Sequence, residues 1–498
     1  MPMPFSMHLQ VGRPLRGRRK GWWAKLLLSL SLAFGAQAAA SPDYAIVVSA
    51  PTLAAPGWSH VVAALQLGRQ APVLEYATGA LESVLPGLQR VFPRRTAFVA
   101  RPEEATREFV PAVHQLMRRL DEDPYTDGFW GIVTGYDAAN ALRLARHRAP
   151  LTVRRVAAGT EVALECCPEG VWYSELKAGH AVRKQAGETP ASIAVPTDTT
   201  ALLAQALMDY GADLFVTSGH ATERDWQIGF GYRNGRFLSR QGKLYGEDLQ
   251  RQQSPIASPG PRGYLPVGNC LMGHIAGPDA MALAFLNSAG VYQMIGYTLP
   301  TWYGYAGWGC LDYFVEQPGR YNFVEAFTAN QHALAHRLET FFPGLADAAM
   351  DAQGRLREKV ALTDRARQAG LRETDGRGLR FDRDTVAFYG DPAWVARMAD
   401  GPLGWEQALS ETDGLWTFTV QPTRGEGSFR PVNLNGSQRG GRPFIQFLPH
   451  RIQNVRMIAG VEWEPVVTDD FILVPRPSDP ARPVRVLFRA QRVEGGSP

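Results

Sequence analysis

Residues 213–220 read DLFVTSGH, and residues 264–270 read YLPVGNC. Each segment is a short apolar run that ends in a small residue and then a reactive side chain, His220 in one and Cys270 in the other. Runs of this length and composition are typical of buried strands in a parallel sheet. Because ligands bind beyond the carboxyl ends of such strands, the two segments predict a functional site at one edge of the sheet, provided that the strands are neighbours.

Strand and helix patterns alternate on both sides of these segments, which predicts an α/β fold with a mostly parallel sheet flanked by helices. From about residue 403 the sequence pattern changes to short β-type runs separated by Gly, Pro and Asn, which predicts a β-sandwich. The strands that we expect in the α/β part are 44–49, 73–76, 97–100, 130–134 and 291–296, and the helices are 109–120, 138–144, 201–210, 278–287 and 321–339. Four parts are expected: a leader (1–40), an N-terminal α/β subdomain (41–195), a second α/β subdomain with both reactive segments (196–402) and a C-terminal β-sandwich (403–498).

The first forty residues have the pattern of a cleavable secretory signal. Six basic residues, the last of them Lys25, precede the apolar run 26–34 (LLLSLSLAF), and no acidic residue occurs before Asp43. The run is far shorter than the ~20 residues that a membrane-spanning helix needs, although an uncleaved anchor is the alternative. We therefore expect an exported protein, periplasmic or secreted, with cleavage near Ala38 or Ala40 and no stable membrane span afterwards.

Loss of the leader changes the charge of the protein. The whole chain has 52 Lys and Arg against 48 Asp and Glu, and six of the basic residues lie in the leader, so the remainder has 46 against 48 and a net charge near −2. This balance removes the support for a nucleic-acid-binding surface, and no nucleic-acid partner is expected. The four cysteines are too few for a disulfide framework. The oligomeric state is left open.

A thiol and an imidazole at neighbouring strand ends would form a nucleophile and its general base. A thiol attacks as the thiolate, and His220 within reach of Cys270 would accept its proton. Gly219 and Gly268 permit close approach of a substrate to the backbone, and the backbone at Gly219, Ala221 and Cys270 is the candidate oxyanion-stabilising element. The motifs of serine-hydrolase elbows, phosphate-binding loops and zinc peptidases do not occur in the sequence.

Both segments resemble those of gingipain-type cysteine peptidases, which have a caspase-like fold. Residues 213–220 resemble the histidine strand of that family, and residues 264–270 resemble its nucleophile strand. Residues 285–290 (FLNSAG), which lead into 295–298 (IGYT) and Trp302-Tyr303, resemble the element that forms part of the S1 pocket. Later in the chain, YGDP at 389–392 resembles a short motif of the same domain.

The resemblance implies a caspase-like sheet, an immunoglobulin-like C-terminal sandwich and a cysteine endopeptidase that acts through an acyl-enzyme. By that resemblance His220 is the general base, and Cys270 is the nucleophile whose amide donates to the oxyanion. The substrate would be a peptide or protein, and neither a cofactor nor a metal is expected. The candidate substrate-binding residues are Asn269, Thr298, Trp302 and Tyr303.

Two residues depart from the family pattern. Ala221 stands where the family usually has Gly, and Asn269 stands where Ala is more usual; either change fits a divergent specificity or a lost activity. One alternative is therefore a catalytically inactive relative that serves as a periplasmic or surface binding module. Another is a Cys–His hydrolase or transferase acting on a non-peptide acyl or amide group. A disulfide between Cys270 and Cys310 would remove the nucleophile altogether.

Some other features have two readings. Adjacent Cys166 and Cys167 fit either a vicinal disulfide or two structural thiols. His274 lies four residues after Cys270, a spacing suited to a metal, but no second pair of ligands supports zinc. The aromatic residues at 302, 303, 305 and 308 fit either a substrate groove or the packing beneath it.

Overall fold

The computed structural model describes residues 43–351, 353–432, 442–479 and 481–493. The predicted signal at 1–40 lies outside these residues, so export stays a prediction. Within the described part of the chain, no helix has the length and apolar character that crossing a membrane requires.

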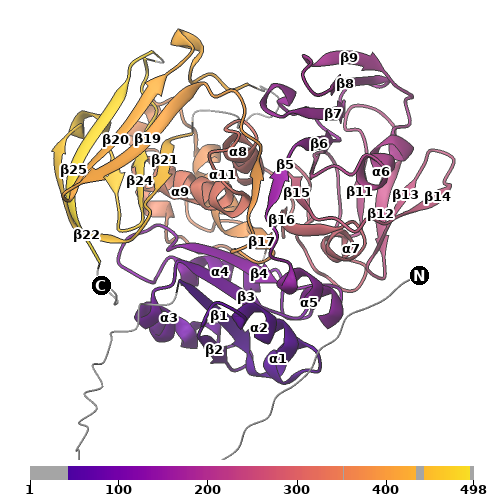
Figure 1. Ribbon diagram of the computed structural model, residues 1–498, viewed down its shortest axis with the longest axis horizontal. Coiled ribbons are helices and arrows are strands. Elements are labelled where there is room, and N and C mark those ends of the chain that lie inside the picture. Colours follow the sequence, from indigo (N-terminus) through magenta and orange to yellow (C-terminus); the bar gives the residue numbers. More distant parts are fainter. Residues whose placement is uncertain (1–42, 352, 433–441, 480, 494–498) are drawn as a thin grey trace, which may run out of the picture. The chain divides into compact units, whose positions relative to one another are not determined.

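Twelve strands of the described residues form one large sheet (Figure 1). Its order is β2 (Val73–Tyr76), β1 (Tyr44–Ser49), β3 (Arg95–Val99), β4 (Phe129–Val133), β17 (Val386–Tyr389), β16 (Val291–Tyr297), β15 (Arg262–Pro266), β10 (Leu214–Thr217), β6 (Arg155–Ala158), β7 (Glu169–Tyr173), β8 (His180–Lys184) and β9 (Ala191–Ala194). Neighbouring strands pair in parallel except for β16 with β17 and the last two pairs, β7 with β8 and β8 with β9. The predicted mostly parallel sheet is confirmed.

Helices cover both faces of this sheet, as the alternation of side chains in β1 demonstrates. Ile46 and Val48 pack in one core with α2 (Trp58–Gln66) and α5 (Ala138–Arg146), whereas Ala45 and Val47 belong to the core on the opposite face. The opposite core includes residues of α4 (Phe109–Met117), α8 (Tyr305–Phe314), α9 (Phe323–Phe341) and α11 (Glu373–Thr385). Burial on two faces explains why these strands are apolar throughout. The other helices are α1 (Ala50–Ala54), α3 (Leu85–Val91), α6 (Thr200–Met208), α7 (Met281–Asn287) and α10 (Asp364–Gln368).

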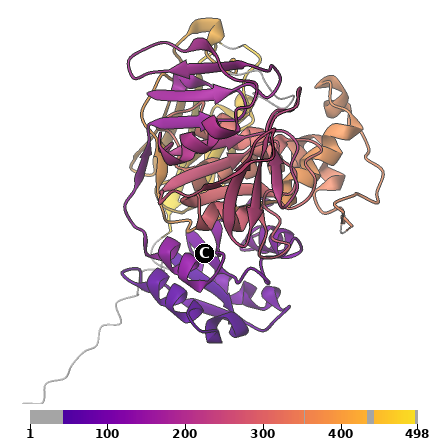
Figure 2. The ribbon, with the colours of Figure 1, turned by 90° about the vertical axis from the view of Figure 1, so that its right-hand side faces the viewer.

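The segment 151–195, which the sequence presents as irregular, contains strands. After the short β5 (Leu151–Val153), which pairs with β18 (Ala396–Met398), strand β6 pairs in parallel with β10. Strands β7, β8 and β9 continue the sheet side by side from β6 (Figure 2). Although they precede the proposed boundary at residue 195, these strands thus extend the half of the sheet that carries the reactive segments. A smaller antiparallel sheet follows, with β11 (Asp225–Gln227), β12 (Arg236–Arg240), β13 (Lys243–Glu247) and β14 (Gln253–Ile256).

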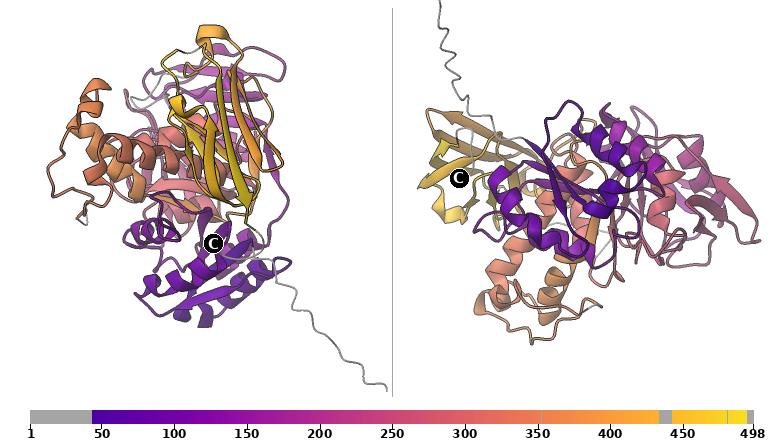
Figure 3. Two further views of the ribbon diagram at one scale, coloured as in Figure 1. Left: turned by 90° about the vertical axis from the view of Figure 1, so that its left-hand side faces the viewer. Right: turned by 90° about the horizontal axis from the view of Figure 1, so that it is seen from below.

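The C-terminal part is a sandwich of two antiparallel sheets, in agreement with the predicted immunoglobulin-like architecture (Figure 3). Phe418 and Val486 of one sheet pack in a common core with Phe444 and Ile472 of the other. The first sheet has the order β19 (Trp405–Thr412), β20 (Leu415–Pro422), β25 (Val484–Arg492) and β22 (Ile452–Ala459), and the second has the order β21 (Phe444–Phe447), β24 (Phe471–Val474) and β23 (Val466–Val467).

Candidate active site

The two reactive segments follow neighbouring strands of the large sheet. Strands β10 and β15 pair in parallel, with Leu214 opposite Gly263 and Thr217 opposite Pro266. Because their carboxyl ends lie at the same edge of the sheet, the loop that carries His220 and the loop that carries Cys270 leave the sheet next to each other. This arrangement meets the condition on which the predicted site depends.

Asn269 connects the two loops through its buried side chain. Its Nδ2 donates to the carbonyl oxygen of Gly219 at 3.0 Å, and its Oδ1 accepts a hydrogen bond from Thr217 Oγ1 at 2.6 Å. Thr217 Oγ1 also lies 2.9 Å from the hydroxyl of Tyr264. Asn269 is fully buried, so its side chain fixes the residue before His220 to the residue before Cys270. An alanine at position 269, as is more usual in the family that the segment resembles, would make neither hydrogen bond. Asn269 therefore adds a link between the two loops that alanine would not provide.

Thr301 contacts the Cys270 loop and was not singled out from the sequence. Its backbone N–H donates to Cys270 Sγ at 3.3 Å, and its Oγ1 donates to the carbonyl oxygen of Asn269 at 2.9 Å. An N–H group aimed at sulfur stabilises negative charge on that atom. The sequence signal was the position of Thr301 inside the segment 298–303, which also carries Trp302.

Tight backbone geometry surrounds both reactive residues. Gly219 has φ +96°, and Leu271, directly after the cysteine, has φ +58°, a left-handed conformation that is costly for a residue with a side chain. A Cβ on Gly268 would lie only 2.6 Å from Ser218 Oγ, so a larger residue there would force the Ser218 side chain to move.

Ala221, the other departure from the family pattern, fits its position. The residue forms an isolated antiparallel bridge with Trp226, and its backbone is not in the left-handed region that favours glycine. Trp226 is fully buried, and its Nε1 donates to the carbonyl oxygen of Ser218 at 2.7 Å. The oxyanion role of the backbone at Gly219, Ala221 and Cys270 stays a prediction.

His220 lies at the surface beside an aromatic side chain. The centroids of the His220 and Phe230 rings are 4.8 Å apart, and the carbonyl oxygen of His220 accepts a hydrogen bond from the Gln227 N–H at 2.9 Å. His220 also lines a cavity of about 490 Å³ whose other walls carry charged residues of the small antiparallel sheet, among them Arg236 and Glu247. The imidazole is therefore accessible to a substrate.

Glu175 is a buried carboxylate close to the His220 loop, and no sequence pattern pointed to it. Its Oε1 accepts a hydrogen bond from Thr160 Oγ1 at 2.8 Å, and its carbonyl oxygen accepts from the N–H of Phe230 and of Gly231. Its Oε2 lies 3.7 Å from the position that a Cβ on Gly219 would occupy. A buried carboxyl group therefore lies close to the residue that precedes His220.

Cys270 differs from the other three cysteines in exposure. All four thiols are free, so neither the vicinal disulfide nor the Cys270–Cys310 disulfide is formed. Burial raises the pKa of Cys166 and of Cys167 to about 12, and it also raises the pKa of the fully buried Cys310. Cys270 alone among the four is partly exposed. Since reactivity requires an accessible thiolate, Cys270 is the candidate nucleophile of the chain.

The three remaining substrate-binding candidates occupy different environments. Trp302 is 71% exposed and directly follows Thr301, whose N–H donates to Cys270 Sγ. Tyr303 packs edge-on against Phe381, with ring centroids 5.7 Å apart. Thr298 is buried, and its Oγ1 donates to the Thr385 carbonyl oxygen at 2.9 Å. The later aromatic residues 305 and 308 are buried in α8, which favours packing for that half of the aromatic cluster.

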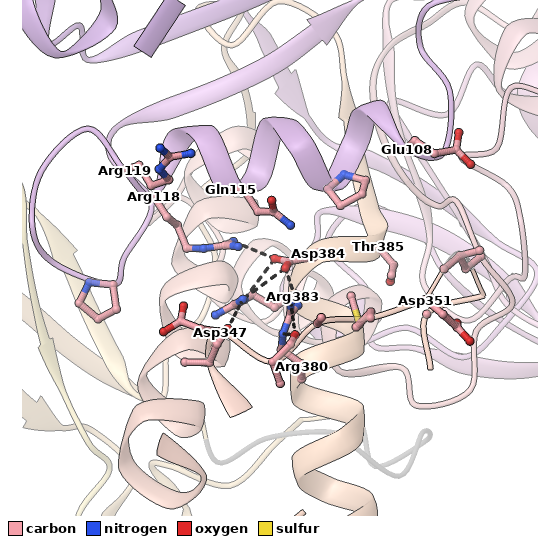
Figure 4. Close-up of a pocket in the computed structure, with 18 of the residues that line it drawn as sticks. Glu108, Gln115, Arg118, Arg119, Asp347, Asp351, Arg380, Arg383, Asp384 and Thr385 are labelled. Carbon is pink, nitrogen blue, oxygen red and sulfur yellow. Dashed lines mark hydrogen bonds and ion pairs between the residues drawn. The ribbon is translucent and has the colours of Figure 1, made fainter. Parts of the chain in front are cut away.

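A cavity of about 910 Å³ lies between α4, α11 and the segment 346–354 (Figure 4). Buried Asp384 forms ion pairs there with Arg118, Arg380 and Arg383. Although burial opposes ionisation, these guanidinium groups hold the pKa of Asp384 well below its usual range. Arg380 and Arg383 also donate to the carbonyl oxygens of Ala348 and Ala346, so the cluster fastens this segment to α11.

The imidazole of His274 lies beside the guanidinium group of Arg107. Its Nε2 lies 2.6 Å from Nη2 of Arg107, and burial together with Arg107 lowers the pKa of His274. A neutral imidazole beside a guanidinium group forms a hydrogen bond. This contact does not add a metal ligand to the Cys270 and His274 spacing noted in the sequence.

Comparisons with known proteins give matches among solved structures only. No protein-family model and no curated protein matches the chain. The chain is similar to the crystal structure of the Arg-specific cysteine proteinase gingipain R (RgpB), with 11% identity, 91% of this chain and 98% of that chain covered, and a TM-score of 0.44. It is also similar to the complex of the Porphyromonas gingivalis RgpB pro- and mature domains, with 11% identity, 90% and 100% coverage and a TM-score of 0.42. Both solved structures are of the gingipain type that the two reactive segments resemble.

Proposed function

We propose that this protein is an exported cysteine endopeptidase that hydrolyses peptide bonds with Cys270 as nucleophile and His220 as general base. The observation that carries the proposal is the placement of both residues on loops that follow the adjacent parallel strands β10 and β15 and are joined by the side chain of Asn269. The export signal at residues 1–40 supports the exported location.

In the first half of the reaction, His220 accepts the thiol proton, and Cys270 Sγ attacks the carbonyl carbon of the scissile bond. The oxygen of that carbonyl takes up negative charge and is stabilised by N–H groups of the strand-end loops. The C–N bond then breaks, the departing amine takes the proton from His220, and an S-acyl enzyme is left. The N–H of Thr301 stabilises negative charge on the sulfur before attack and during departure.

In the second half, His220 removes a proton from water, and the resulting hydroxide attacks the thioester carbonyl. The C–S bond breaks, the peptide acid leaves, and the proton returns to the thiolate. Trp302, the exposed aromatic residue that follows Thr301, is the candidate contact for a substrate side chain. Buried Glu175 lies close to Gly219, the residue that precedes His220.

Incubation of the purified chain with a diverse peptide library, with cleavage products read by mass spectrometry, tests the proposal. We expect cleavage by the unchanged protein and none by Cys270→Ala, with a strong loss in His220→Ala. Cys310→Ala is the matched control because it also removes one thiol, but from a fully buried position. Absence of cleavage by a folded, unchanged protein, or equal cleavage by Cys270→Ala, would contradict the proposal.

A further inference from the structure

Large apolar side chains are exposed at the edge of the sheet where the proposed active site lies. In the described ranges, five such residues are more than half exposed to solvent: Leu67, Leu176, Phe230, Trp302 and Val461. Trp302 follows β16 and Leu176 follows β7, and these strands end at the same edge as β10 and β15, because successive neighbours from β16 to β7 pair in parallel. Phe230 reaches this edge through its contact with His220. Adjoining apolar side chains left in water mark contact sites, whereas single ones are ordinary.

Phe230 is held against the imidazole of His220. The two ring centroids are 4.8 Å apart, yet Phe230 remains 53% exposed. The N–H groups of Phe230 and Gly231 both donate to the carbonyl oxygen of Glu175, at 2.6 and 2.7 Å. Phe230 Cβ lies 3.9 Å from the position that a Cβ on Gly219 would occupy. The backbone therefore fixes an exposed aromatic residue directly beside the proposed general base.

Leu176 belongs to the segment that holds Phe230, and it is 57% exposed. Its N–H donates to Ser174 Oγ at 3.2 Å, and the hydroxyl of Tyr232 donates to the Ser174 carbonyl oxygen at 2.9 Å. A Cβ on Gly231 would lie 3.1 Å from Leu176 Cα, so the segments 174–176 and 230–232 are in close backbone contact. The two exposed residues that these segments carry are called here the Phe230–Leu176 surface.

The order of the strands gives the direction in which a substrate crosses the site. Strand β15 lies between β16 and β10, so the Cys270 loop has the segment 298–303 on one side and the His220 loop on the other. In the proposed reaction the departing amine takes its proton from His220. The part of the substrate that follows the scissile bond must therefore lie on the His220 side, and the part that precedes it lies toward Trp302.

We propose that the Phe230–Leu176 surface binds an apolar side chain at P1′, the residue directly after the scissile bond. This inference rests on the proposed function, because it uses the proton transfer from His220. The P1′ side chain is attached one carbon from the nitrogen that His220 protonates, and the Phe230 ring is in contact with that imidazole. Contact with Phe230 would remove apolar area of both groups from water. Leu176, two strands farther along the edge, extends the surface toward the following residues.

The cavity of about 490 Å³ that His220 also lines gives a different expectation. Arg233 and Arg251 are among its charged walls, so a P1′ side chain bound there would be acidic. Neither Phe230 nor Leu176 lines this cavity. The contact of the Phe230 ring with the imidazole itself favours the apolar surface, and the P1′ preference distinguishes the two.

Internally quenched peptides that share one cleavable sequence and differ only at P1′ (Leu, Phe, Ala, Asp or Lys) test the proposal. The unchanged protein should cleave the Leu and Phe peptides with a kcat/KM about tenfold above that for the Asp and Lys peptides. Phe230→Ala should remove most of this preference, and Phe230→Leu, which supplies an apolar side chain again, should recover it. A second set varied at P2′ and P3′ tests Leu176, because Leu176→Ala should reduce any apolar preference there.

A peptide methyl ester with the same residues before the scissile bond separates substrate contact from the positioning of His220. The ester has no P1′ residue, so Phe230→Ala should lower the rate on the Leu peptide about tenfold more than the rate on the ester. Leu67→Ala is the matched control, since it removes an apolar side chain that is 79% exposed at the end of α2. This control should keep the P1′ preference of the unchanged protein.

Three results would overturn the inference and leave the proposed function standing. They are a preference of the unchanged protein for acidic P1′ residues, the absence of any P1′ preference, and an equal loss on the ester and the Leu peptide in Phe230→Ala. No cleavage of any peptide by the folded, unchanged protein would overturn the proposed function and this inference together.

Discussion

The side-chain amide of Asn269 donates to the carbonyl oxygen of Gly219 at 3.0 Å, which joins the backbone next to His220 to the backbone next to Cys270. The Asn269 side chain is fixed further, because its Oδ1 accepts a hydrogen bond from Thr217 at the end of β10. The spacing of the two reactive loops is therefore set by one buried side chain as well as by the pairing of the strands.

Asn269→Ala should impair catalysis more than folding. The substitution leaves the Gly219 carbonyl and the Thr217 hydroxyl without this partner, at a cost of about 1–3 kcal/mol in the free energy of unfolding. A shift of the loops by about 1 Å would lower kcat/KM about 100-fold. Chemical denaturation and peptide-cleavage kinetics of the same preparation measure the two effects.

Asn287→Ala is the matched control for this prediction. The Asn287 amide also donates to a glycine carbonyl, that of Gly242 at 2.9 Å, but at the end of α7. This control should lose stability with little change in kcat/KM. Equal kinetic losses in both variants would mean that Asn269 acts only through overall stability.

Gly307 allows α8 to approach the end of β15. A Cβ on Gly307 would lie 2.0 Å from the carbonyl oxygen of Val267, a backbone atom that moves only together with the strand leading to Cys270. Gly307→Ala should therefore destabilise the fold by roughly 1–3 kcal/mol and displace the nucleophile. Thermal unfolding and cleavage rates check this; in Gly344→Ala, where a Cβ meets open space, both should stay near the values of the unchanged protein.

Most of the strands visible in the sequence are buried along their whole length, as β1, β10 and β15 are, although the partly exposed edge strand β2 was also predicted. The expected strands 44–49 and 73–76 coincide with β1 and β2, and the apolar runs before His220 and Cys270 are β10 and β15. The segment 151–195 was read as irregular because its strands are short and partly exposed. Helix α11 was not predicted, since Gly376 and Gly378 give its sequence a low helix propensity.

The site could be predicted only in part. An apolar run followed by His220 or Cys270 is visible in the sequence, but the partners of those residues come together by tertiary folding. Glu175 approaches Gly219 from a separate strand region, and Thr301 reaches Cys270 from the loop after β16. The Glu175 contact has no local sequence signal, whereas Thr301 lies inside the segment 298–303, in which the sequence singles out Trp302 and Tyr303.

His332 should make the protein less stable at acid pH. Its ring is fully buried against Phe471, both ring nitrogens lack a hydrogen-bond partner among the described residues, and burial lowers its pKa to about 3. An unfolded histidine has a pKa near 6.5, so between about pH 6.5 and pH 3 the unfolded chain binds the extra proton. The contribution of neutral His332 to the free energy of unfolding is therefore complete above pH 6.5. Below pH 6.5 the free energy of unfolding falls by about 1.4 kcal/mol per pH unit because of this group.

His332→Phe removes that proton-binding group and keeps a flat ring against Phe471. The pH dependence of the unfolding free energy between pH 6 and pH 4.5 should therefore be less steep by about 1.4 kcal/mol per unit. Denaturant unfolding at several pH values compares the two proteins, and identical slopes would show that His332 does not contribute. Other buried histidines, such as His114, remain in both proteins and cancel in the comparison.

The difference in exposure among the cysteines predicts selective alkylation. Iodoacetamide should modify the folded chain once, at Cys270, because the other three thiols are buried and burial raises their pKa. Peptide mapping by mass spectrometry identifies the modified residue, and denatured protein should take up four labels. Modification of Cys166 or Cys310 at the rate of Cys270 would show that the fold does not shield them.

The central claim is that Cys270 acts as a nucleophile assisted by His220, and reaction with a peptidyl acyloxymethyl ketone tests it most directly. The account predicts a covalent thioether at Cys270 Sγ, formed with loss of the carboxylate leaving group and located by mass spectrometry. The adduct should be absent in Cys270→Ala, much slower to form in His220→Ala and unchanged in Cys310→Ala. Failure of the folded, unchanged chain to react across a broad panel of P1 side chains, or a rate that does not depend on His220, would contradict the account.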